Sequence, residues 1–303
     1  MKKKVLAGVL AAMTMVSMAG CGSSSSGSTA SSSAAAEAAS AAEASADTAT
    51  ASAAATADAT AASADVADSD VAYIKDKGTL IVGITDFEPM DYKDDSGNWI
   101  GYDADLAAKV AEDLGVEVQF EEIDWDNKIL ELDNKSIDVV WNGMTLTDEV
   151  TNSMACTNAY LNNAQVVVLP SDKADQYPDV DSMKDLSFAV EAGSAGEAAA
   201  KEEGFTYTSM TSQADTLMEI QAGTSDASII DLLMAGAMIG EGTSYPNLTH
   251  TLELTTEKYG IGCRKGSDLA DYINGELKKF YDDGSMQTIA EKYGVQDAIV
   301  SQD

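Results

Sequence analysis

Every aromatic residue and every proline of this 303-residue chain lies after residue 70. Residues 22–70 consist almost wholly of Ser, Ala, Thr, Gly and acidic residues. Such a segment cannot bury enough apolar surface to offset the entropy lost when a chain is ordered. We therefore expect a folded part only after residue 70, preceded by a Ser/Ala-rich disordered tether with a reach of about 40 Å. The alanine runs within the tether could still form transient helix.

The first 21 residues have the pattern of an export signal. A basic start, 1–4, precedes a short apolar stretch, 5–18, which is too short to be read as a membrane span. The residues Met-Ala-Gly before Cys21 resemble a bacterial lipobox, with Met where Leu is more usual. This predicts a signal peptide, 1–20, and a tether, 21–70, that begins at a lipidated, palmitate-bearing Cys21. An ordinary signal that is cleaved elsewhere is the alternative.

Charge and composition argue against several functions. Residues 71–303 carry 44 acidic and 15 basic side chains, and the resulting negative field repels nucleic acids. The chain has one histidine, His250, and no HExxH or CxxC pattern, which argues against a His/Cys metal site and against a Ser-His-Asp or Cys-His enzyme. We therefore predict no metal, no cofactor and no nucleic-acid partner.

Buried-strand and helix patterns alternate through the folded part, which predicts an α/β fold with mostly parallel sheets. Strands are expected at 79–84, 116–120, 137–141, 165–169, 187–190, 205–208, 227–230, 248–254 and 259–263. Helices are expected at 103–114, 126–132, after residue 196, at 213–222 and 231–239, and in two closing segments after residue 268.

Five ordered motifs within 79–294 resemble those of the bacterial solute-binding proteins that serve polar amino-acid ABC importers. They are GYDADL at 101–106, IDVVWNGMTLTDE at 137–149, AVEAGS at 189–194, YGIGCRKG at 259–266 and DGSMQTIAEKYG at 283–294. Each motif is weak alone, but their order over this length is specific. The resemblance implies a two-lobe, periplasmic-binding-protein-like (type II) fold with two hinge segments. Lobe 1 would be 71–164 plus 259–303, lobe 2 would be 165–258, and ligand would bind between them.

The resemblance also implies a set of ligand-binding residues. The aromatic pair would stack on the ligand, a strand-to-helix loop would bind its α-amino group, Asp231 would neutralise that ammonium, and a helix start would hold its carboxylate. These residues are Phe87, Trp125, Asn142, Gly143, Thr145, Ser194, Ala195 and Asp231. The alternatives are that both rings are core, that Asp231 only caps a helix, and that 193–196 is an ordinary turn.

The chain departs from the family pattern where the ligand's carboxylate would bind. Val150 stands where an Arg usually grips that carboxylate bidentately. The one Arg of the chain, Arg264, lies in a strand near the hinge, and we do not expect it to reach the cleft. Lys128 or the helix start at Ser194 could replace the missing Arg, or the ligand needs no such partner.

Acidic residues near the expected cleft favour a positively charged ligand. Asp86, Glu88 and Glu191 would join Asp231 and the aromatic rings there. Glu88 and Glu191 could instead be a solvated rim. We therefore predict that the ligand is a cationic amino acid or a carboxylate-free amine.

Taken together, these features predict an extracellular, lipid-anchored receptor of an ABC importer, of a Gram-positive type of envelope. It would bind a small molecule without catalysing a reaction. It would act as a monomer that delivers its ligand to a permease and its ATPase. The alternatives are a sensor or adhesion lipoprotein and, less favoured, a dehydratase or lyase on the same fold. Cys156 and Cys263 could form a disulfide bond or stay buried thiols.

Overall fold

The computed structural model describes residues 69–303. The predicted signal peptide, Cys21 and nearly all of the predicted tether lie outside the described residues. Helix α1 (Asp70–Lys77) begins at the last residue of that tether, and the Ser69 side chain caps it by accepting a hydrogen bond from the N–H of Ala72. The Ser69 hydroxyl and the Val71 N–H donate to Asp268 at 2.5 and 3.1 Å. The folded part therefore includes Ser69.

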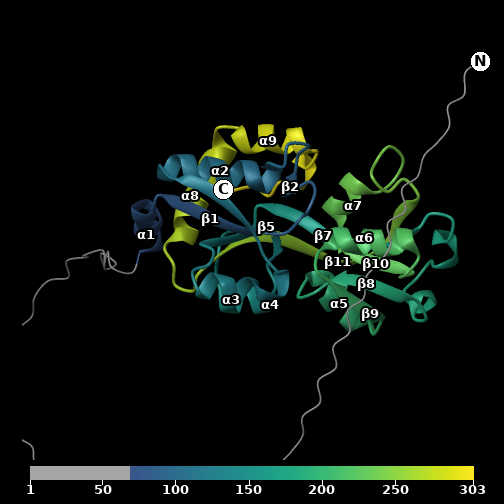
Figure 1. The fold of residues 1–303 in the computed structure, drawn as a ribbon. Coiled ribbons are helices and arrows are strands. Elements are labelled where there is room, and N and C mark those ends of the chain that lie inside the picture. Colours follow the sequence, from purple (N-terminus) through teal and green to yellow (C-terminus); the bar gives the residue numbers. More distant parts are fainter. Residues whose placement is uncertain (1–68) are drawn as a thin grey trace, which may run out of the picture. The chain divides into compact units, whose positions relative to one another are not determined.

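Nine strands of the described chain form one mixed sheet in the order β4-β1-β5-β11-β7-β10-β8-β9, with β6 paired to β11 beside this path (Figure 1). The strands are β1 (Thr79–Ile84), β4 (Glu117–Glu122), β5 (Val139–Thr145), β6 (Ala155–Cys156), β7 (Leu161–Pro170), β8 (Ser187–Glu191), β9 (Thr206–Met210), β10 (Ala227–Asp231) and β11 (Leu248–Cys263). A separate hairpin joins β2 (Tyr92–Lys93) and β3 (Trp99–Ile100).

Helices cover both faces of the sheet, as the predicted α/β class requires. In Figure 1, α2, α8 and α9 lie on one side of β1 and β5, and α3 and α4 lie on the other. Likewise α6 and α7 lie on one side of β8 and β10, opposite α5. The bounds are α2 (Tyr102–Leu114), α3 (Lys128–Asp133), α4 (Asp148–Ser153), α5 (Ala195–Glu203), α6 (Gln213–Ala222), α7 (Leu232–Met238), α8 (Leu269–Asp282) and α9 (Ser285–Tyr293).

Two long antiparallel strands, β7 and β11, join the two halves of the sheet. Their pairing runs from Leu248 opposite Pro170 to Tyr259 opposite Leu161. The sequence predicted two separate strands, 248–254 and 259–263, but the structure has one continuous strand. Register shifts between residues 250 and 255 bend β11 without ending its pairing. The polar residues 255–258 interrupt the apolar pattern, although their backbone remains paired.

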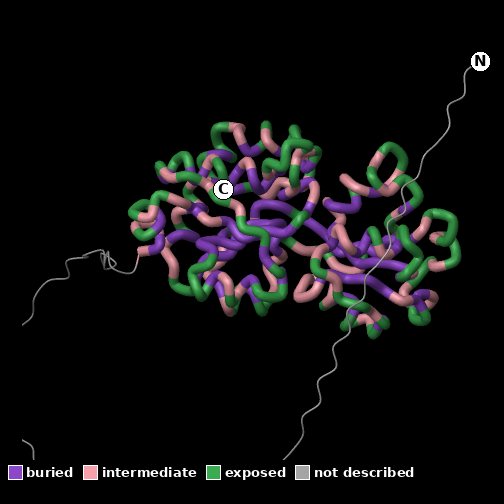
Figure 2. Tube along the Cα trace, in the orientation of Figure 1, coloured by how far each residue is buried: buried purple, intermediate pink, exposed green. Residues whose placement is uncertain are grey.

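The core follows the inner strands β5, β7, β8 and β10, which are largely buried, while the outer faces of the helices are exposed (Figure 2). The edge strands β4 and β9 are mostly exposed or half-buried. The largest apolar cluster contains residues from both halves of the sheet, including Val82 and Ile230. A second cluster packs around β8, and a third packs around α3 and the far side of β5. Trp141 is fully buried in the largest cluster, as expected for a core residue.

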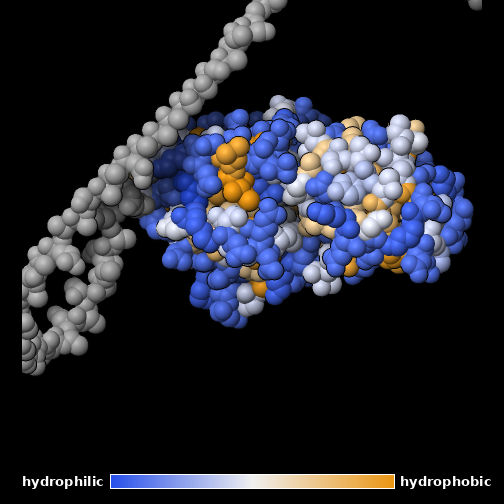
Figure 3. Space-filling model, turned by 90° about the horizontal axis from the view of Figure 1, so that it is seen from below, coloured by the Kyte–Doolittle hydropathy of each residue, from blue (hydrophilic) through white to orange (hydrophobic). Residues whose placement is uncertain are grey.

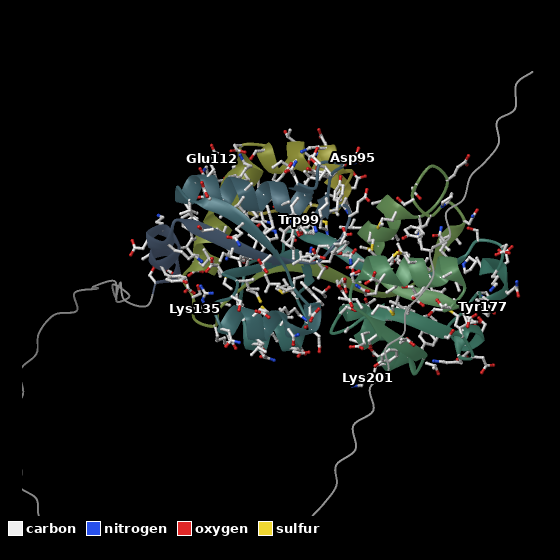
Figure 4. The ribbon with its side chains drawn as sticks, viewed as in Figure 1. Asp95, Trp99, Glu112, Lys135, Tyr177 and Lys201 are labelled. Carbon is white, nitrogen blue, oxygen red and sulfur yellow. The ribbon has the colours of Figure 1, made fainter. Side chains whose placement is uncertain are left out.

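The surface is mostly hydrophilic, with small hydrophobic patches, in the view of Figure 3. Charged side chains such as Glu112, Lys135 and Lys201 lie at its periphery in Figure 4 and are exposed. Within residues 69–303, no helix is both long enough and apolar enough to cross a membrane.

The disulfide considered for Cys156 and Cys263 is not formed, because both are free thiols in the structure. Cys156 on β6 pairs with Gly262, the residue before Cys263, so the two cysteines lie on neighbouring strands. Burial raises the pKa of both thiols, which makes them poor nucleophiles for forming a bond.

Arg264 holds the start of the folded part against the sheet and does not reach the cleft. Its Nε and Nη2 donate to Asp70 at 2.9–3.1 Å, and its Nη1 donates to the Ile137 carbonyl at 2.9 Å. Its Nη2 also lies 3.5 Å from Asp138, which pairs with Lys77. All of the ions that contact Arg264 are buried.

We expect Arg264→Met to lower the free energy of unfolding by about 3–5 kcal/mol, because it leaves Asp70 and Asp138 buried without their guanidinium partner. Urea unfolding measures this change. Lys265→Met, at the exposed neighbouring residue, is the matched control and should change stability by less than about 0.5 kcal/mol. Equal stability of the two variants would show that the buried ion cluster does not hold this end of the fold.

Candidate functional site

A cavity of about 230 Å³ opens where several strands end. The last residues of β5, β8 and β10 are Thr145, Glu191 and Asp231, and all three line it. Ligands of α/β proteins bind at the carboxyl ends of strands. The lining residues are Phe87, Trp125, Lys128, Asn142, Gly143, Met144, Thr145, Thr147, Asp148, Glu149, Val150, Glu191, Gly193, Ser194, Ala195, Ala198, Gln213 and Asp231.

The structure brings all eight residues that the resemblance assigned to the ligand to this cavity, from Phe87 to Asp231. Of the three further acids, only Glu191 lines it. Asp86 is exposed and borders another, more acidic hollow with Glu121 and Glu122. Glu88 is only partly buried. The backbone pairs Phe87 with Asp91, and Glu88 lies in the turn between them.

The two rings are both cavity wall and core. Phe87 and Trp125 are 3% and 7% exposed. The Phe87 ring packs edge to face against the Tyr259 ring, with 6.4 Å between the ring centroids. It also lies so close to Gly143 that a Cβ there would fall 2.6 Å from it. Gly143 has a φ of 54°, so both close packing and backbone conformation require glycine at this position.

Asn142 and Gly143, which the resemblance placed in a strand-to-helix loop, lie within β5 and are held by buried polar groups. Asn142 accepts hydrogen bonds from the N–H and hydroxyl of Thr85, and donates to the Thr85 carbonyl and to Asp91. The Gly143 N–H donates to Asp103 at 2.7 Å. Burial raises the pKa of Asp91 well above its usual range and that of Asp103 to about 7. The side chain of Asn142 therefore holds this end of β5 in place, which leaves the backbone of Asn142 to contact a ligand.

Asp231 has three side-chain partners, and all are uncharged. The Nδ2 of Asn163, the Nε2 of Gln213 and the hydroxyl of Tyr259 each donate to it at 2.5 Å. Burial, with repulsion from Glu257, raises its pKa to about 8. Asp231 stands before α7, but its side chain makes no capping hydrogen bond. The capping alternative is therefore wrong for its side chain.

Glu257 on β11 is a residue that the sequence reasoning missed. One of its oxygens accepts from the Thr145 hydroxyl, Asn163 and Gln165 at 2.7–2.9 Å. Glu257 therefore connects the end of β5 to β7 and, through Asn163, to Asp231. Its polar surroundings in 255–258 gave no pattern that could have singled it out.

No arginine replaces the carboxylate-binding arginine that the family has at the position of Val150, because the one arginine of the chain, Arg264, is bound to Asp70. Lys128 lines the cavity, but its Nζ donates to the carbonyls of Trp125 and Gly193 at 3.1 and 2.9 Å and lies 4.9 Å from the Trp125 ring centre. Burial lowers the pKa of Lys128. The Gly193 N–H already donates to Glu197.

A family model, Bacterial extracellular solute-binding proteins, family 3, matches residues 80–296. The chain belongs to this family. The family is one of binding proteins, so the protein is a solute receptor and not an enzyme, as predicted.

Several proteins of known function and structure are similar to this chain. The L-cystine-binding protein TcyA of Bacillus subtilis (strain 168) is 30% identical over 235 residues, which are 76% of this chain and 87% of TcyA. The arginine-binding extracellular protein ArtP of the same organism is 29% identical over 227 residues, 72% of this chain and 86% of ArtP.

Solved structures agree with the predicted fold. A mutant of ArgBP from T. maritima has a TM-score of 0.70 and 30% identity, covering 74% of this chain and 99% of that one. An ABC uptake transporter substrate-binding protein from Streptococcus pneumoniae with bound histidine has a TM-score of 0.70 and 26% identity, covering 78% and 100%. The predicted fold class, a mixed α/β periplasmic-binding-protein-like fold, is confirmed.

We expect the ligand-free protein to lose stability as pH rises from about 4 to about 8. In this range the folded protein keeps protons on Asp231 and Glu191, whose pKa values burial raises to about 8, whereas the unfolded chain releases them. The slope is at most about 1.4 kcal/mol per pH unit for each group. Urea unfolding at several pH values should show a shallower slope for the Asp231→Asn, Glu191→Gln double variant. Identical slopes would contradict the raised pKa values.

Proposed function

We propose that this protein captures an amino acid or a related amine in the cavity and delivers it to the permease of an ABC importer. The observation that carries the proposal is Asp231, a fully buried carboxylate at the cavity wall whose partners are all neutral. An ammonium group of the ligand would supply the missing positive charge. The names of the relatives, which bind arginine and cystine, support the same class of ligand.

The proposed receptor consists of two lobes, 71–164 plus 259–303 and 165–258, with β7 and β11 as the crossings. Both proposed lobes contribute to the cavity, for instance Thr145 from the first and Glu191 from the second. Lys128 of the first donates to the Gly193 carbonyl of the second. Hinge closure around the ligand would then be the signal that the permease reads.

We infer that the ligand is cationic or amine-bearing. The cavity lining contains four carboxyl side chains and one ammonium, and Arg264 is paired away from it. With Val150 in place of an arginine, a ligand carboxylate would depend on the amino end of α5. A cationic amino acid or a carboxylate-free amine fits this balance of charges better than an acidic amino acid does.

Asp231→Asn keeps the size of the side chain but removes its charge. We expect it to weaken binding of the preferred ligand by about 2–5 kcal/mol, at least roughly thirtyfold. Calorimetry on a panel of amino acids, their decarboxylated amines and their amides measures this. Asp124→Asn, at an exposed acid outside the cavity, is the control. Undiminished binding by Asp231→Asn would place the site elsewhere, and preference for an acidic amino acid would refute the charge argument.

We also propose that Cys21 carries a lipid that anchors the protein at the extracellular face of the cell membrane. The support is the Met-Ala-Gly-Cys sequence after a basic and apolar start. A lipid anchor strengthens membrane binding by about 0.8 kcal/mol per buried methylene group.

Cys21→Ser removes the thiol that would be acylated. We expect the protein to move from the detergent phase to the aqueous phase in a detergent-partition experiment on expressing cells, with ligand affinity unchanged. Cys156→Ser is the control, because it removes a thiol of the folded part. If the wild-type protein already partitions into the aqueous phase, the anchor proposal is wrong.

A further inference from the structure

Glu191 is a second carboxylate in the cavity wall. It ends β8, which is paired on one side with β9 and on the other with β10. Its side chain is almost wholly buried, with 2% exposure. Its Oε1 has no hydrogen-bond partner among residues 69–303. Buried polar groups in folded proteins are rarely left without a hydrogen-bond partner, so each exception needs an explanation.

No cation of the described chain forms an ion pair with Glu191, although the charge of nearby Lys128 acts against burial and lowers the pKa of Glu191. Lys128 is the one basic residue that lines the cavity, and its Nζ is held by two backbone carbonyls instead. The ion pairs within residues 69–303 do not include Glu191. Asp231 is close enough to repel it and so adds to the effect of burial in raising its pKa.

The two acids differ in how they are satisfied. Asp231 accepts three short hydrogen bonds from neutral groups and lacks only a positive charge. Glu191 forms no ion pair within residues 69–303, and its Oε1 accepts no hydrogen bond there. Gln213, which also lines the cavity, donates to Asp231 and lies beside Glu191. The two acidic groups therefore stand side by side in one small cavity.

We propose that Glu191 forms a second cation subsite, so that the ligand carries two positive charges, one for Asp231 and one for Glu191. The proposal rests on the proposed function, which supplies the first ammonium. The second group would be an alkylammonium or guanidinium, since these donate the hydrogen bond that Glu191 Oε1 lacks. A ligand with one positive charge would leave Glu191 buried and unpaired. Glu191 would therefore disfavour a ligand whose distal group is neutral.

The test compares ligands that differ only in the distal charge. Calorimetry with the purified full-length protein would use arginine against citrulline, lysine against norleucine, and 1,5-diaminopentane against 1-aminopentane. We expect the wild type to bind at least one dication ten times or more tightly than its matched partner. In Glu191→Gln this preference should fall to within about twofold, mainly through loss of dication affinity.

Two further variants separate the subsite from general effects. Glu121→Gln removes one exposed acid outside the cavity and should keep the full preference. Glu191→Met removes both the charge and the hydrogen-bonding groups, and it should lose the preference for dications as Glu191→Gln does. Thermal unfolding checks that each variant is folded.

The outcomes separate this inference from the proposed function. If Glu191→Gln keeps the preference for the dication, or if no dication binds more tightly than its partner, the second subsite is refuted while binding through Asp231 still stands. If no amine or amino acid of the set binds the wild type at all, both are refuted.

Discussion

The antiparallel pairing of β7 with β11 is the interaction on which the site depends. These two strands join the halves of the sheet, and they also carry the side chains that surround Asp231. Asn163 and Gln165 come from β7, and Glu257 and Tyr259 come from β11. The polar groups at the floor of the cavity are therefore positioned by the same backbone hydrogen bonds that connect the two halves. A displacement along this ladder would change the connection and the site together.

The cavity favours a positively charged ligand because buried acids line it and the basic side chains nearby are bound to other groups. Buried Asp231 and Glu191 have no ionic partner among the described residues, while Arg264 is used near the start of the folded part and Lys128 bonds to carbonyls. Burying carboxylates in this way costs stability. Without a ligand, Asp231 and Glu191 avoid this cost by keeping their protons, since burial raises the pKa of both to about 8. Entry of a cation should therefore be linked to proton release. The same two groups thus explain both the expected pH dependence and the expected selectivity.

Much of the fold was predictable because its signals are local. The strand at 79–84 and the helix at 213–222 appear in the structure with those bounds. The motifs around 142–145 and 191–195 led to the cavity because they stand at strand ends. Glu257 and Gln213 could not be found in this way, since their roles arise from contacts between residues far apart in sequence. Asp86 and Glu88 were placed by proximity to Phe87, but sequence distance does not tell on which side of a chain a carboxylate lies.

Helix α1 is fastened at its first turn by Ser69 and Val71 to Asp268 and by Asp70 to Arg264. It packs on α8 and β1, remote from the strands β8 and β10 that end at the cavity (Figure 1). A pulling force applied at Ser69 would therefore act first on these hydrogen bonds to Asp268 and Arg264. These contacts would break before such a force could separate the strands that line the cavity.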